Sequence, residues 1–133
     1  MPRKSSPQPT EVEVAILRVL WDRGPSSVRQ VHEALSAARD TGYSTTLKMM
    51  QVMFDKGLLK RDESVRPQVY RPAQPEAKTQ TQMVDDLVQK VFGGSARKLV
   101  MRAVQSEQVS PGELAEIRKL LKEMEKPSTG DRQ

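Results

Sequence analysis

Four polar side chains gather near the start of residues 41–59, a segment whose apolar residues follow helical spacing. Leu47, Met50 and Phe54 recur at i, i+3 and i+7, which places them on one face of a helix. The polar residues lie off that face and are Thr45, Thr46, Lys48 and Gln51. Hydroxyls, a lysine and an amide at the start of a helix suit contacts with phosphates and base edges in the DNA major groove, and Gln51 suits adenine. An ordinary amphipathic helix with a solvated polar side remains the alternative.

The two ends of this segment carry recognisable helix signals. Ser44 is the expected N-cap, because a serine hydroxyl can accept a hydrogen bond from the first turn, and it is also a candidate phosphate donor. Gly57 is the expected stop, since glycine adopts the left-handed conformation that follows many helices. Leu58 should then fold back towards Met53, as a Schellman-type ending requires.

The residues needed for metal or catalytic chemistry are scarce. The chain has no cysteine and one histidine, His32, which excludes thiolate zinc sites and multi-histidine metal sites. No Gly-rich phosphate loop and no HExxH motif occurs. Asp85 and Asp86 are adjacent, so on a helix they point about 100° apart and cannot face one another. We therefore expect no enzyme, no cofactor and no metal.

Two helices are predicted before this segment, and each begins with a capping box. Thr10 with Glu13, and Ser27 with Gln30, have the spacing of a helix start. The first helix should run to about Asp22 and the second to about residue 38. The predicted buried faces are Val12, Ile16, Val19 and Leu20 in the first helix and Val28, Val31 and Leu35 in the second, with Trp21 as a core anchor.

A β-hairpin is predicted directly after the central segment. Residues 59–62 and 69–72 alternate apolar and charged side chains around a polar turn. A hairpin in this position is a wing, and Lys60, Arg61 and Arg66 suit phosphate or minor-groove contact. Ser27 and Arg29 could contact the DNA backbone from the start of the second helix, although capping alone also explains Ser27.

Three more helices are predicted in the second half, at about residues 79–92, 95–105 and 110–126. Three short helices make a poor independent core, so pairing with a second copy across a two-fold axis is expected to bury their apolar stripes. The residues assigned to this dimerisation surface are Met83, Leu87, Val91, Leu99, Leu114, Ile117, Leu121 and Met124.

The predicted fold class is mostly α with a small β-hairpin: a winged helix-turn-helix domain plus a three-helix dimerisation unit. The expected domains are residues 8–74 and 75–126, between disordered tails at 1–7 and 127–133.

The first 75 residues hold 12 Lys/Arg against 8 Asp/Glu, and the remainder hold 10 against 9. The excess positive charge therefore lies in the half where DNA would dock. The chain shows neither a signal peptide nor a membrane span, and we expect a soluble, cytoplasmic protein.

An ordered set of short stretches resembles the penicillinase-repressor family (BlaI/MecI/CopY). The stretches are LRVLW at 17–21, VRQVH at 28–32, YSTT at 43–46, KGLLKR at 56–61, YRP at 70–72, FGG at 92–94 and LV at 99–100. The resemblance covers roughly residues 8–125. It implies a homodimeric winged-helix repressor that binds inverted repeats in promoters, and it adds Tyr43 to the candidate DNA-binding residues.

The resemblance also implies a route of induction, with departures. In the antibiotic-responsive branch, a membrane metallopeptidase sensor triggers cleavage of the dimerisation unit at an Asn-Phe pair, which falls at Arg102-Ala103 here. The copper-responsive branch uses cysteine pairs, which this chain lacks. Val52 stands where many members have an arginine late in the recognition helix. From the antibiotic-responsive branch, the resemblance implies a membrane metallopeptidase sensor or another protease as a candidate partner.

A winged-helix adaptor that binds a protein instead of DNA is the alternative function. The two hypotheses differ in their salt dependence. For DNA binding, the logarithm of affinity should fall by about 0.9 per neutralised phosphate for each unit in the logarithm of salt concentration.

Overall fold

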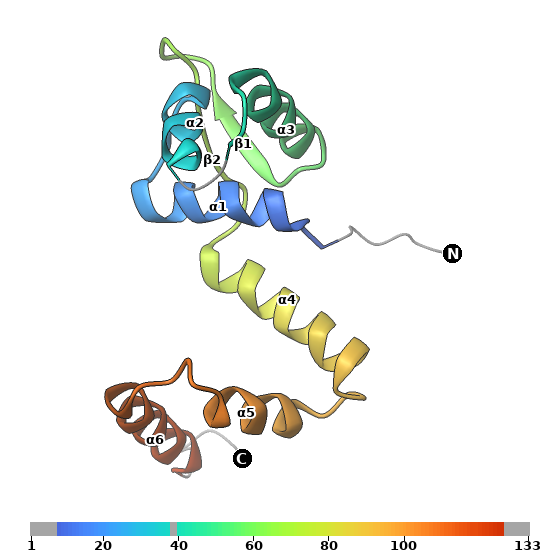
Figure 1. Ribbon diagram of the computed structural model, residues 1–133, viewed down its shortest axis with the longest axis vertical. Coiled ribbons are helices and arrows are strands. Elements are labelled where there is room, and N and C mark those ends of the chain that lie inside the picture. The colour runs from blue at the N-terminus through green and yellow to red at the C-terminus, as the bar shows by residue number, and fades with distance from the viewer. Residues whose placement is uncertain (1–7, 38–39, 127–133) are drawn as a thin grey trace. The chain divides into compact units, whose positions relative to one another are not determined.

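The computed structural model describes residues 8–37 and 40–126, which form six helices and one antiparallel hairpin (Figure 1). This confirms the predicted fold class of mostly α with a small β-hairpin. The predicted tails and the predicted end of the second helix at residue 38 lie outside the described residues. The elements are α1 (Glu11–Arg23), α2 (Val28–Ser36), α3 (Tyr43–Asp55), β1 (Leu59–Asp62), β2 (Val69–Pro72), α4 (Glu76–Val91), α5 (Ala96–Gln105) and α6 (Pro111–Glu125).

Both predicted capping boxes near the amino end are present. At the start of α1, the Thr10 amide donates to Glu13 Oε1 at 2.9 Å and the Glu13 amide donates to Thr10 Oγ1 at 3.2 Å. Ser27 and Gln30 form the same reciprocal pair at the start of α2, at 2.9 and 3.2 Å. Each box pairs two backbone N–H groups that the helix itself leaves unsatisfied, which fixes where the helix begins.

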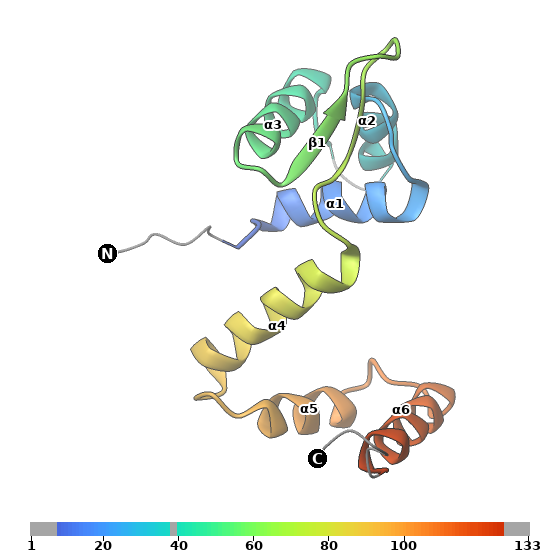
Figure 2. The same ribbon diagram turned by 180° about the vertical axis from the view of Figure 1, so that it is seen from behind.

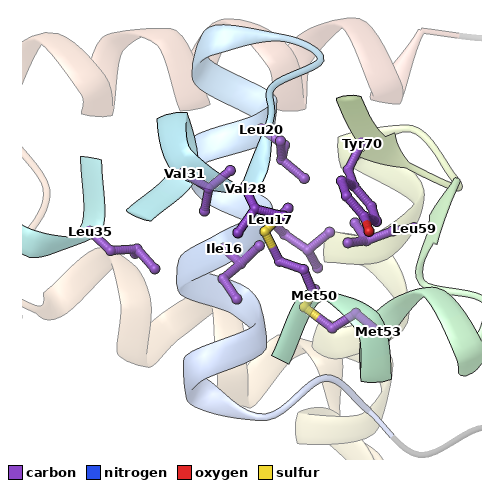
Figure 3. Packing of buried hydrophobic residues seen from close by; sticks show 10 residues of the cluster. All are labelled: Ile16, Leu17, Leu20, Val28, Val31, Leu35, Met50, Met53, Leu59 and Tyr70. Atoms are coloured by element: carbon purple, nitrogen blue, oxygen red, sulfur yellow. The ribbon is translucent and has the colours of Figure 1, made fainter. Parts of the chain in front are cut away.

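One hydrophobic core joins α1, α2, α3 and the hairpin, and Figure 3 shows side chains from all of these elements converging. The prediction for α2 is confirmed, but in α1 the buried face includes Leu17, whereas Val12 and Val19 are half-buried. Trp21 is half-buried and packs against this core. The core residues are Ile16, Leu17, Leu20, Val28, Val31, Leu35, Met50, Met53, Leu59 and Tyr70.

Helix α3 has the predicted end and a different beginning. Gly57 has φ +86°, its amide donates to the Phe54 carbonyl at 3.1 Å, and the Leu58 amide donates to the Met53 carbonyl at 2.9 Å. These two bonds make the predicted Schellman ending. The N-cap is Gly42 with no side-chain bond, so the prediction of Ser44 as N-cap is wrong. Ser44 lies inside the first turn, beyond the position from which its hydroxyl could cap.

The hairpin pairs β1 with β2 from Leu59 opposite Pro72 to Asp62 opposite Val69. Its second strand is also bonded to the loop before α2, because the Ser26 amide donates to the Tyr70 carbonyl at 3.0 Å and the Tyr70 amide donates to the Ser26 carbonyl at 2.8 Å. A hairpin this short is marginal by itself, so these attachments stabilise it. Both views place the hairpin tip and α1 at opposite ends of this part of the molecule (Figure 1, Figure 2).

The carboxyl half contains α4, α5 and α6. Helix α4 begins at Glu76, earlier than predicted, and the Gln74 side chain donates to the Thr79 hydroxyl at 3.3 Å and to Gln82 at 3.1 Å. The chain divides into two compact units between Val84 and Asp85, later than the boundary expected at 74/75. The start of α4 therefore belongs with the N-terminal unit.

The last helix begins with a third capping box, formed by Ser110 and Glu113 at 2.8 and 3.1 Å, with Pro111 as the first helical residue. This agrees with the predicted helix start. Within residues 8–37 and 40–126, no helix has both the length and the apolar content that crossing a membrane requires.

Candidate nucleic-acid interface

The polar start of α3 separates into an exposed side and one buried residue. Ser44, Thr45, Lys48 and Gln51 are exposed. Thr46 has a relative exposure of 1%, and its hydroxyl donates to the Gly42 carbonyl at 3.3 Å. The prediction that Thr46 faces DNA is therefore wrong, because its side chain points into the core and its donor is used within the helix.

The beginnings of α2 and α3 meet at a cation and two aromatic rings. The Arg29 guanidinium carbon lies 5.0 Å from the centre of the Tyr43 ring, which is within the range of a cation–π contact. The His32 ring packs edge-on against Tyr43 with 5.8 Å between centroids. Tyr43 keeps 39% of its surface exposed. This arrangement holds Arg29 beside the amino end of α3.

Ser27 serves as a cap. Its side chain accepts from the Gln30 amide and the residue is 5% exposed, so its hydroxyl is already used at the helix start. A contact between Ser27 and a phosphate through its hydroxyl would have to compete with that bond. Arg29, the second residue of the same helix, is exposed and is the more accessible of the two predicted residues.

A groove runs between α2, α3 and the hairpin, and several of the predicted DNA-binding residues line it. Apolar side chains, including Leu47 and Val65, form part of its wall. The predicted residues in the groove are Ser27, Arg29, Tyr43, Gln51, Arg61 and Arg66. Residues far apart in the sequence therefore share one surface, which is the arrangement that a groove-reading protein requires.

The cations of the hairpin differ in their surroundings. Lys60 and Arg66 are exposed, so their charges are accessible to a phosphate. Arg61 instead forms an ion pair with Glu63, with 2.6 Å between Nη2 and Oε2, and its guanidinium lies 4.1 Å from the centre of the Phe54 ring. Tyr70 and then Glu63 raise the pKa of Arg61 further above its high ordinary value, so it stays charged. The predicted phosphate contact of Arg61 would require its present partners to be released.

An ion pair between buried Glu13 of α1 and partly exposed Lys56 at the end of α3 was not predicted. Lys56 Nζ lies 2.7 Å from Glu13 Oε2, while Oε1 of the same carboxylate accepts from the Thr10 amide. Burial acts most strongly on the pKa of Glu13 and raises it, but the bonds from Lys56 and Thr10 outweigh burial and leave the pKa below its usual value. Glu13 shares the helical face of Ile16 and Leu20, which are buried. A carboxylate on that buried face was the sequence signal that could have predicted a partner cation.

None of the residues assigned to dimerisation is buried in the single chain. Met83, Leu99, Leu114 and Ile117 are half-buried. The others are more open: Leu87 is 44%, Leu121 50%, Val91 64% and Met124 73% exposed. The candidate cleavage residues, Arg102 and Ala103, are exposed within α5.

Comparisons with known proteins find sequence relatives along nearly the whole chain. A family model described as "Penicillinase repressor" matches residues 9–123. The "Transcriptional regulator BlaI" of Mycobacterium tuberculosis is 35% identical over 117 residues, which covers 86% of this chain and 83% of that protein. The "Penicillinase repressor" of Bacillus licheniformis is 22% identical over 120 residues, which covers 90% of this chain and 94% of that protein.

One solved structure is also similar: the Bacillus licheniformis BlaI monomeric form in complex with the blaP half-operator, studied in solution. Its sequence identity is 25% and its TM-score is 0.49, over 56% of this chain and 92% of that chain.

Proposed function

The chain belongs to the penicillinase-repressor family, and we propose that it represses transcription as a homodimer bound to an inverted-repeat operator. The observation that carries the proposal is the shared surface of α2, α3 and the hairpin, where Arg29, Gln51 and Arg66 lie along one groove. Membership in a family of repressors confirms that the chain is not an enzyme.

Helix α3 is the element we assign to the major groove. Lys48 is exposed and serves as a phosphate or base contact, and Gln51 is the candidate for adenine, whose N6 and N7 match an amide. Ser44 and Thr45, exposed on the first turn, are further contacts, and Tyr43 contributes beside Arg29. Lys60 and Arg66 extend the contact along the backbone from the wing.

The second copy is supported by the apolar surface of the C-terminal helices. Leu87, Leu121 and Met124 are each at least 44% exposed in a single chain, and exposed large apolar side chains that gather together mark interaction sites. A two-fold dimer would bury these stripes and present two α3 helices to the two halves of a palindrome.

Relief of repression is assigned to proteolysis of the C-terminal unit in the cytoplasm, by a membrane metallopeptidase sensor or another protease. Arg102 and Ala103 are exposed, which leaves the bond between them open to attack once α5 frays. A cut there would separate α6 from α4 and divide the dimerisation surface.

The test is genome-wide mapping of bound DNA, followed by a salt titration on the enriched duplex. Lys48→Ala should weaken binding and reduce the slope of log affinity against log salt by about 0.9 if Lys48 neutralises one phosphate. Arg18→Ala is the matched control, because it also removes one exposed cation but lies on α1, away from the groove.

Two results would refute the proposal. The first is the absence of any enriched site together with affinity that does not change with salt, which would favour the protein-binding adaptor. The second is equal loss of affinity in Lys48→Ala and Arg18→Ala, which would show that net charge alone, and not the α3 surface, binds the duplex.

A further inference from the structure

Arg61 lies at the junction between the wing and α3. In β1 the side chains alternate, so that Leu59 is buried, Arg61 is partly buried, and Lys60 is exposed. Arg61 therefore points to the same side as the core residue Leu59, towards α3 and away from the face that presents Lys60. Its side chain is 24% exposed.

Several groups hold the Arg61 guanidinium in this position. Its Nε donates to Glu63 Oε2 at 2.8 Å, and Nη2 lies 2.6 Å from the same oxygen. Its guanidinium carbon lies 4.1 Å from the centre of the Phe54 ring on α3 and 6.0 Å from the centre of the Tyr70 ring on β2. The guanidinium thus connects both strands of the wing to the recognition helix, and its charge is already paired.

The wing needs such a connection because its paired strands end at Asp62 and Val69, before the tip that carries Arg66. As the chain leaves β1, the Ser64 amide and hydroxyl donate to Asp62 Oδ1 at 2.9 and 2.6 Å, which also lowers the pKa of Asp62. We therefore expect the paired strands, where Arg61 lies against Phe54, to set the direction of the tip.

We propose that Arg61 is a positioning residue that fixes the wing against α3, and that it is not a phosphate ligand. This inference rests on the proposed DNA binding for its functional consequence, because a fixed wing places Lys60 and Arg66 at a set distance from α3. The claim that Arg61 holds the wing against α3 concerns the protein without DNA and can be tested without DNA.

The first measurement is amide hydrogen exchange of the full chain without DNA, comparing Arg61→Ala, Arg61→Lys and Lys60→Ala. Loss of the cation–π contact and the partly exposed ion pair together should speed exchange of the β1 and β2 amides by about tenfold in Arg61→Ala. Arg61→Lys should do nearly the same, because lysine lacks the guanidinium that lies over the Phe54 ring and makes two contacts to Glu63. Lys60→Ala, the matched loss of one charge on the adjacent exposed side, should leave exchange unchanged.

The second measurement is affinity for the mapped duplex. A positioning role predicts that Arg61→Lys weakens binding by about tenfold, as does Arg61→Ala, although it keeps the positive charge. Hairpin exchange that stays at the wild-type rate in Arg61→Ala, or an Arg61→Lys variant that binds like the wild type, would overturn the inference. If the wild-type chain binds no duplex, the proposed function fails, and the exchange measurement still decides whether Arg61 holds the wing.

Discussion

The two units of the chain begin their helices in the same way but bury their side chains differently. In the N-terminal unit, α1, α2, α3 and the hairpin share one core whose central residues, such as Ile16, Val31 and Met50, are 0% exposed. Among the described residues of the C-terminal unit, Val88 is the buried hydrophobic residue at 7%, and neither α5 nor α6 buries any residue.

The capping boxes show what this difference means. Thr10, Ser27 and Ser110 each start a helix with the same reciprocal bonds, two in one unit and one in the other. Local sequence therefore forms helices equally well in both units. The units differ in how many neighbouring elements pack over each apolar helix face. The N-terminal unit has enough to complete its own core, whereas the C-terminal unit, in our proposal, completes its core with a second copy.

The largest expected effect is at the centre of the proposed dimer surface. Ile117→Asp would place an unpaired carboxylate in a surface that dimerisation buries, and each dimer carries the substitution twice. Burying the two carboxylates should destabilise the dimer by about 3 kcal/mol or more in total, so the dimer dissociation constant should rise by at least about a hundredfold. Sedimentation velocity at several protein concentrations measures this, and operator affinity should fall with it.

Arg118→Gln is the control for Ile117→Asp, since it changes the net charge by the same amount at the neighbouring, exposed position. It should leave the dimer intact. A dimer that persists in Ile117→Asp would show that the assigned surface is not the interface.

The next effect concerns the N-terminal core. Leu20 is 1% exposed, and Leu20→Ala should lower the free energy of unfolding of this unit by about 2–5 kcal/mol through lost burial and the cavity left behind. The chain should remain a dimer, and the loss should not depend on protein concentration when followed by denaturant unfolding. A loss that disappears at high protein concentration would mean that both units unfold together, and the contrast between them would be wrong.

A smaller effect, dependent on pH, is expected at the ion pair between Glu13 and Lys56. Glu13→Gln keeps the capping role, which Gln30 performs in α2, and removes only the charge that pairs with Lys56. Because Lys56 is partly exposed, the loss should be about 2 kcal/mol at neutral pH.

The sign of the pH effect follows from the pKa of Glu13, which is lower in the folded chain than its usual value of 4.5. The ion pair therefore stabilises the fold above pH 4.5, and this contribution is lost as the pH falls through the folded pKa. Thermal unfolding should show wild type and Glu13→Gln converging in stability under acid. A constant difference at every pH would contradict the role of the charge.

Sequence patterns predicted the elements that depend on local bonds. The capping boxes, the Gly57 ending of α3 and the hairpin were all predictable, because neighbouring residues make their hydrogen bonds. The rotation of α3 was not, because it depends on packing against α1 and α2. Met53 and Thr46 face the core while Leu47 and Phe54 are half-buried, so spacing alone correctly exposed Thr45 but wrongly exposed Thr46 as well.

Contacts between residues far apart in the sequence were the other feature that sequence patterns could not predict. Lys56 meets Glu13 from far along the chain, and Arg61 meets Phe54 across the junction of the wing and α3. Both cations look like free surface charges in the sequence. Only the tertiary fold shows that each already has a partner.

The most direct test of the contrast between the units is native mass spectrometry of the full chain, alone and with the mapped inverted-repeat duplex. A core completed by a second copy predicts a dimer in the free protein and two chains on each duplex, with no populated complex of one chain at equimolar protein. A monomer that binds each half-site independently, without loss of affinity, would contradict it.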